Sequence, residues 1–381
     1  MREPYLKWMI VIFTALLFIL VSKPARCQHG WPLGPTNVGH PIGNSFGEFQ
    51  DYGGCINTRH CIYQHSGIDI LGTPKYDSNN SVDPTAPWVF ATVRGTVEEI
   101  QGACNQTEDS TSYYTSIKGA DGLTYRYGHL QRCSYDPDLV FKANNGQEVE
   151  AGSPIAQLVR WYVCDYHHLH YDILKNDRFV NPLAGITPHD DGEPAEIAGI
   201  FFARSGSDPW EEIRDRNLEG CLAVSGEVEI IAQVRDRDSA GSNQTLWVRN
   251  ILWRACPESD PDCAWTNTYS FDEIPIEWNT TGNNRYTSAY FSVRDPWVSI
   301  DDYCQQAWFY AVVTNFVGGR PDGDGSWNTR TIFDGGYLLS LKAIDFGGNE
   351  TTYTTKVCVN NGRRGDDVPP GAPNGFRISP D

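Results

Sequence analysis

The stretch Tyr166-His-His-Leu-His-Tyr-Asp172 places two histidines, His168 and His170, two positions apart. Alternate side chains of an extended strand lie on the same face, so these two imidazoles are expected to project together, with Leu169 on the opposite face. Two imidazoles on one face suit a metal ion and its attendant base. A pair of histidines does not define a metal site by itself, so further ligands must come from elsewhere in the chain.

Two upstream stretches supply candidates for those ligands. In Gln64-His-Ser-Gly-Ile-Asp-Ile70, His65 and Asp69 are four positions apart, and a glycine-containing turn between them would bring both side chains to one ion. The second stretch, Tyr125-Arg-Tyr-Gly-His-Leu130, adds His129. Each histidine alone is more often an ordinary surface or core residue, and it is their occurrence in this order that points to a site.

These three motifs in this order resemble the lysostaphin-like (LytM-type) zinc endopeptidases, and the resemblance covers roughly residues 40–182. It implies one zinc ion with three protein ligands: His65, Asp69 and His170. It also implies that His129 and His168 are catalytic histidines that do not bind the zinc. One of them would take a proton from the zinc-activated water, and the other would stabilise the oxyanion or protonate the leaving amine.

Two neighbours of the histidine pair need separate interpretations. Strand alternation directs His167 away from the site, so it is not expected to be a ligand. Asp172 is expected to be either a solvated carboxylate or a carboxylate that supports a ligand, rather than a ligand itself.

The fold class predicted from the whole chain is all-β. Short runs of β-forming residues broken by turn residues, such as Trp88-Val-Phe-Ala-Thr-Val-Arg-Gly95, predict an antiparallel β-sheet domain over residues 28–182, and the resemblance implies that it is a peptidase domain. Alternation returns after Cys221, where Val228, Ile230, Ala232 and Val234 share one face, and predicts an immunoglobulin-like β-sandwich over residues 221–360. Residues 183–220 are expected to be a connector and residues 361–381 a flexible tail.

Residues 1–27 are predicted to be a signal peptide. Basic residues precede an apolar run of 14 residues, Trp8 to Val21, which is short for a membrane span, and Ala25-Arg-Cys27 supplies the cleavage region. The alternative is an uncleaved signal-anchor. The sequence therefore predicts a secreted protein, extracellular or in the cell envelope, without stable membrane insertion once the signal is removed.

The cysteine content agrees with secretion. The chain has 11 cysteines, and removal of Cys27 leaves ten, an even number that predicts up to five disulfides. The close pairs Cys55/Cys61 and Cys256/Cys263 are the expected local bridges. Five cysteines lie in each half, so complete pairing requires at least one bridge between the halves. A Cys-x-x-Cys pair is absent from the sequence, which disfavours a zinc ribbon.

Charge and resemblance together define the predicted function. The net charge of −18 becomes −21 without residues 1–27, and such an acidic surface repels nucleic acid and anionic membranes. The resemblance implies a secreted zinc metalloendopeptidase that hydrolyses peptides, with peptidoglycan cross-bridges or stem peptides as substrates. The alternatives are a non-enzymatic scaffold or regulator that retains the peptidase-like domain, and an extracellular binding protein that acts through residues 221–360.

Overall fold

The computed structural model describes fourteen segments of the chain, and every structural statement below refers to them. They are residues 29–52, 61–72, 88–101, 114–131, 144–158, 167–189, 191–205, 212–214, 216, 220–237, 244–279, 308–317, 320–321 and 325–362. The predicted signal peptide and nearly all of the predicted tail lie outside them. None of the helices in these segments is both long and apolar enough to cross a membrane.

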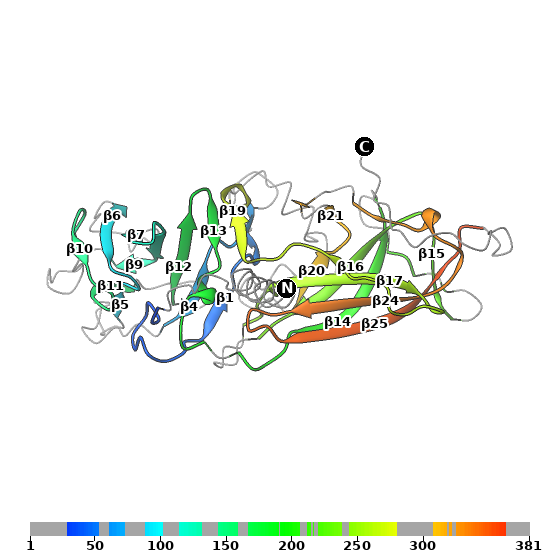
Figure 1. Ribbon diagram of the computed structural model, residues 1–381, viewed down its shortest axis with the longest axis horizontal. Helices are drawn as coiled ribbons and strands as arrows, with labels where there is room; N and C mark the ends of the chain where they lie inside the picture. The colour runs from blue at the N-terminus through cyan, green and yellow to red at the C-terminus, as the bar shows by residue number, and fades with distance from the viewer. Residues whose placement is uncertain are drawn as a thin grey trace, which may run out of the picture.

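An antiparallel sheet forms the core of the first half of the chain (Figure 1). Its strands, in spatial order, are β1 (Ile42–Asn44), β4 (Ile68–Leu71), β12 (His168–Lys175), β8 (Thr124–Gly128), β7 (Tyr114–Gly119), β6 (Gly95–Gln101) and β10 (Glu148–Val149). Beside it lie a three-stranded sheet of β5 (Trp88–Phe90), β11 (Pro154–Leu158) and β9 (Leu130–Gln131), and the pair β2 (Phe49–Tyr52) and β3 (Cys61–Gln64). The all-β prediction is therefore confirmed.

The central strand β12 determines where the histidines lie. Leu169 and Tyr171 are fully buried on the face that packs into the core, and the histidines alternate with them on the other face. Antiparallel pairing places His170 opposite Asp69 of β4 on one side and opposite Gly128 of β8 on the other. The register therefore brings the three sequence motifs to neighbouring strands of one sheet.

Two further sheets occupy the second half of the chain. One contains β14 (Glu196–Arg204), β16 (Glu227–Arg235), β20 (Phe309–Val312) and β23 (Trp327–Asn328). The other contains β15 (Leu222–Val224), β25 (Glu350–Val359), β24 (Gly335–Ile344), β17 (Asn250–Pro257) and β18 (Thr266–Asn267), with β15 and β25 parallel. The pair β21 (Phe316–Val317) and β22 (Arg320–Pro321) and the short 3-10 helices η2 (Pro182–Ala184), η3 (Ile276–Asn279) and η4 (Thr329–Thr331) complete the described elements. An immunoglobulin-like arrangement of these strands stays a prediction.

The range expected to be a connector, residues 183–220, differs from that expectation. It contains the nine-residue strand β14, which pairs along its length with β16, from Glu196 opposite Arg235 to Arg204 opposite Val228. Apolar side chains occur on both faces of β14, because Phe202 packs into the main core while Phe201 packs against a small second cluster that contains Ile231. The run therefore lacks the alternation by which the other strands were predicted.

The two halves of the chain are joined by a strand pair. The strand β19 (Glu273–Pro275) belongs to the second half by sequence, yet it pairs with β13 (Arg178–Val180), which in turn pairs with β12 (Figure 1). Gly47 marks a second contact, because it has a φ of +72° and a Cβ there would lie 2.2 Å from Phe271. The second half is thus in direct contact with the sheet that carries the histidines.

Two disulfides lie among the described residues, Cys221–Cys358 and Cys256–Cys263. The second confirms one of the two predicted local bridges. The other predicted bridge, Cys55/Cys61, falls outside the residues whose side chains are described. Both observed bridges lie within the second half, so a bridge between the halves stays a prediction and would have to use Cys304.

Candidate metal centre

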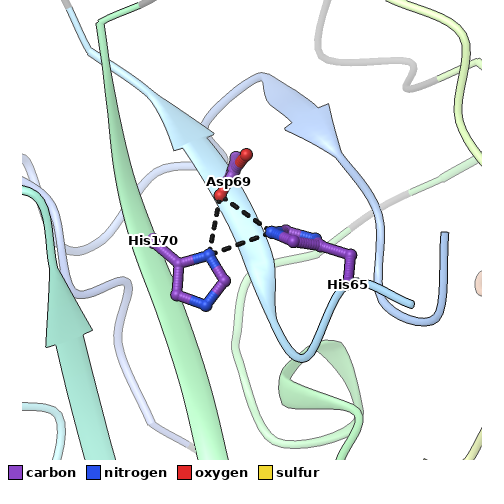
Figure 2. A group of neighbouring side chains, drawn as sticks. All are labelled: His65, Asp69 and His170. Atoms are coloured by element: carbon purple, nitrogen blue, oxygen red, sulfur yellow. Dashed lines mark hydrogen bonds and ion pairs between the residues drawn. The ribbon is translucent and has the colours of Figure 1, made fainter. Parts of the chain in front are cut away.

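Three side chains from two of the predicted motifs converge at one point of the sheet. His65 Nε2 lies 3.1 Å from Asp69 Oδ1, His170 Nδ1 lies 3.0 Å from the same oxygen, and the two nitrogens are 2.9 Å apart (Figure 2). His65 precedes β4, Asp69 is within β4, and His170 is in β12. The sequence motifs therefore meet as the register predicts.

The turn between His65 and Asp69 depends on a glycine. Gly67 lies so close to β12 that a Cβ on it would be 2.2 Å from the backbone oxygen of Tyr171. A side chain at this position would push the turn away from β12 and separate His65 from His170. The short Ser-Gly turn thus fixes the distance between two of the converging side chains.

The remote nitrogen of each imidazole is held by an acceptor. His65 Nδ1 donates to the carbonyl oxygen of Ser45 at 3.0 Å, and His170 Nε2 donates to Asp172 Oδ2 at 3.1 Å. Donation from these nitrogens assigns the tautomers, so the lone pairs of the neutral rings point at each other and at the Asp69 carboxylate. Lone pairs and a carboxylate facing one another repel unless a cation lies between them.

The electrostatics of the group follow from this convergence. Burial opposes a charge on Asp69, but attraction to His168 and His65 and hydrogen bonds with His170 and His65 hold its pKa well below its usual range. Burial also opposes a charge on His170, yet hydrogen bonds with Asp172 and Asp69 and attraction to both carboxylates raise its pKa to about 9. Without a metal ion, a proton on His170 therefore lies next to the Asp69 carboxylate, at the place that a metal cation would take.

The donor set fits zinc. Two imidazole nitrogens and one carboxylate oxygen are ligands of the kinds that zinc accepts. Around a tetrahedral zinc ion with bonds of about 2.0–2.1 Å, the ligand atoms are about 3.3 Å apart. The observed separations of 2.9–3.1 Å need only a small expansion to admit the ion. The ligand group carries one negative charge, which leaves a divalent ion with a charge of +1.

Further side chains orient the converging group. Asn44 Nδ2 donates to Asp69 Oδ2 at 2.7 Å and so directs the other oxygen, Oδ1, at the histidines. Asp172 is fully buried, and its second oxygen lies 3.0 Å from Nε of Arg126. Asp172 is therefore not solvated, and its two oxygens face His170 and Arg126.

A buried carboxylic acid lies on the other side of His65. Glu48 is 4% exposed, and its Oε2 accepts hydrogen bonds from the backbone nitrogen and the hydroxyl of Ser45. Burial raises the pKa of Glu48 well above its usual range, and Ser45 opposes the shift. The sequence motifs gave no site role to Glu48, Ser45, Asn44 or Arg126, although Arg126 stands opposite Asp172 in the register of β8 with β12.

The two predicted catalytic histidines lie beside the converging group. The rings of His129 and His168 are 4.5 Å apart between centroids, and the ring of His129 lies 5.9 Å from that of His170. His168 is buried and its Nε2 lies 3.5 Å from Asp69 Oδ2, whereas His129 is half-buried. His129 has a φ of +58°, a left-handed conformation that is unusual outside glycine and recurs at functional sites.

A second group of potential ligands occurs among the described residues, and it consists of carboxylates alone. It brings Asp191, Asp236 and Asp345 together in the second half of the chain. Without an imidazole it does not resemble the first group, and only the first group adjoins two further histidines.

One protein-family model matches the part of the chain that holds the site. The model of peptidase family M23 matches residues 63–182. No curated protein matches the chain. The matched range contains all five predicted site residues: His65, Asp69, His129, His168 and His170.

Several solved structures are similar to part of this chain. A mutant catalytic domain of the prophage-encoded M23 protein EnpA from Enterococcus faecalis is 22% identical, over 40% of this chain and 88% of that one, with a TM-score of 0.24. The catalytic domain of the antimicrobial peptidase lysostaphin from Staphylococcus simulans is 20% identical, over 35% and 80%, with a TM-score of 0.22. The full-length lysostaphin is 16% identical, over 68% and 100%, with a TM-score of 0.28.

Proposed function

We propose that the protein is a secreted zinc metalloendopeptidase acting on peptidoglycan cross-bridges or stem peptides, because the model of peptidase family M23 matches residues 63–182. This family match supports a peptide hydrolase. The observation that carries the finer proposal is the convergence of two imidazole lone pairs and a carboxylate within 3.1 Å, beside two more histidines.

The proposed ligands are His65, Asp69 and His170. Zinc bound there would supply the Lewis acidity that makes a water nucleophilic near neutral pH and polarises the scissile carbonyl. Ser45 and Asp172 hold the two imidazoles in the tautomers that present lone pairs to the ion. Asn44 keeps the Asp69 carboxylate turned toward the same point.

His129 and His168 are assigned the proton transfers. One removes a proton from the attacking water, and the other stabilises the oxyanion or protonates the leaving amine. His168 is two residues from His170 on the same strand face, so the strand holds it beside the ion without requiring it to bind. Its Nε2 lies 3.5 Å from Asp69 Oδ2, so the ring adjoins a carboxylate that is a proposed zinc ligand.

Secretion is supported by the amino-terminal sequence and by the disulfides. The pairs Cys221–Cys358 and Cys256–Cys263 are of a kind that persists in oxidising compartments. The charge of −21 after removal of residues 1–27 gives no attraction to an anionic cell wall, and this favours a second candidate substrate, another extracellular peptide or protein.

The test is digestion of purified peptidoglycan and of glycine-containing peptides by the full chain, with product masses read to locate the cut bond. We expect cleavage that stops on chelation and returns with zinc. The control is His167→Ala, which removes an adjacent histidine that strand alternation turns away from the site. Intact substrates together with a protein that binds no metal would favour the non-enzymatic scaffold instead. Ligand binding by residues 221–360 with an effect that survives His129→Ala would favour a binding protein.

A further inference from the structure

The segment that follows β1, residues 45–48, holds the proposed ligand His65. The carbonyl oxygen of Ser45 accepts the hydrogen bond from His65 Nδ1. The backbone nitrogen of His65 donates to the carbonyl of Glu48 at 2.8 Å, and the nitrogen of Gly47 donates to the carbonyl of His65 at 2.8 Å. Both the ring and the backbone of His65 are therefore held by these few residues.

Ser45 is in turn held from two directions. Its hydroxyl donates to Glu48 Oε2 at 3.1 Å, and its backbone nitrogen donates to the same oxygen at 2.8 Å. The hydroxyl also accepts a hydrogen bond of 2.7 Å from the backbone nitrogen of Trp247. Ser45 is 1% exposed and Trp247 is fully buried, so these three bonds are shielded from water and fix the position of the Ser45 backbone.

Side-chain packing also joins the second half of the chain to the segment that holds His65. Phe271 lies against Gly47, where no side chain larger than hydrogen fits, and its ring meets that of Trp247 edge to face at 5.6 Å. Trp247 and Phe271 both belong to the second half of the chain. A continuous path of buried contacts therefore leads from the second half through Ser45 to the His65 ring.

We propose that Ser45 and Glu48 are positioning residues for His65, and that the second half of the chain, through Trp247 and Phe271, supports the metal centre rather than serving only as a separate module. The inference rests on the proposed function, because it assigns His65 as a ligand. Groups that orient a metal-binding histidine change metal affinity by about 10–100-fold when removed. The hydroxyl of Ser45 does not contact His65 and acts by holding the Ser45 backbone, so we expect its removal to weaken zinc affinity by about 10-fold.

The experiment measures zinc affinity of the full chain by competition with a chromophoric chelator. The variants are Ser45→Ala, Phe271→Ala, and the pair Glu48→Ala and Glu48→Gln, of which Gln retains the acceptor oxygen for Ser45. The matched control is Ser340→Ala, which removes an equally buried hydroxyl that pairs with Thr354 between β24 and β25. Circular dichroism melting of the metal-free variants establishes which are folded.

We expect Ser45→Ala, Phe271→Ala and Glu48→Ala to bind zinc about 10-fold more weakly than wild type, and Ser340→Ala and Glu48→Gln to bind within about threefold. Wild-type affinity in folded Ser45→Ala and Glu48→Ala would overturn the inference while leaving the zinc site intact. If Ser45→Ala does not fold, equal affinities of Glu48→Ala and Glu48→Gln would overturn it. A wild-type chain that binds no zinc would overturn the proposed function, and the inference with it.

Discussion

The Nε2 atom of His65 lies 2.9 Å from the Nδ1 atom of His170, and each ring already donates from its other nitrogen. Neutral imidazoles in these tautomers can approach so closely only if a proton or a metal ion lies between their lone pairs. The pair can therefore share a proton or bind a metal ion, and the proposed function assigns it the metal ion.

The two histidines that are not proposed ligands, His129 and His168, are expected to be required for turnover but not for zinc binding. Because His129 and His168 lie beside the ligand group, we predict that His129→Ala and His168→Ala each keep one zinc per chain and lower turnover by about 10²–10⁴-fold, the usual contribution of general acid–base groups. Elemental analysis and peptide hydrolysis measure the two quantities. Zinc loss in His168→Ala equal to that in His170→Ala would contradict the assignment.

Asp172 is expected to control metal affinity without contacting the metal. Its carboxylate accepts from His170 and pairs with Arg126, so Asp172→Ala removes the acceptor that fixes the His170 ring. We predict zinc affinity weaker by about 10–100-fold, measured by chelator competition. The exposed carboxylate of Asp260 provides the control, since Asp260→Ala should leave the affinity unchanged. Equal affinities of the two variants would show that Asp172 has no such role.

Gly67 is expected to tolerate no side chain. A Cβ at this position would lie 2.2 Å from the Tyr171 oxygen, so Gly67→Ala must displace the turn that carries His65. We predict a loss of about 1–3 kcal/mol in the free energy of unfolding, measured by urea denaturation, together with weaker zinc binding. Gly192→Ala is the control, because a Cβ there meets no atom within 4 Å. Similar stabilities of the two variants would refute the steric argument.

A bridge between the halves is expected at Cys304. Four of the ten cysteines that follow Cys27 are paired within the second half, which leaves Cys304 and five cysteines of the first half: Cys55, Cys61, Cys104, Cys133 and Cys164. Complete pairing then requires one of those five as the partner of Cys304. Non-reducing peptide mapping should find that cross-link, and alkylation of Cys304 without prior reduction would exclude it.

The shared face of His168 and His170 was predictable because strand alternation is a local rule, whereas their convergence with His65 and Asp69 was implied only by the family resemblance. His168, His170 and Asp172 share a face by alternation, and pairing of β12 with β4 brings Asp69 opposite His170. The support of His65 was not predictable in this way, because it comes from the Ser45 carbonyl, and a backbone oxygen has no sequence signature. The contact from Trp247 joins residues 202 positions apart and arises only in the folded chain.

The fold shows the same division between local and distant information. The strand from Val228 to Val234 is predictable because one of its faces is uniformly apolar. The strand β14 is not, because Phe201 and Phe202 pack against different clusters and the sequence therefore does not alternate. The pairing of β19 with β13 likewise depends on chain segments that are distant in sequence.

The most direct test of the central claim is the zinc content of the purified full chain, determined by elemental analysis after dialysis. We predict one zinc ion per wild-type chain and none in His170→Ala, with His167→Ala as the control that retains the ion. A wild-type chain without zinc, or a His170→Ala chain that binds it as wild type does, would contradict the assignment of His65, Asp69 and His170 as the metal centre.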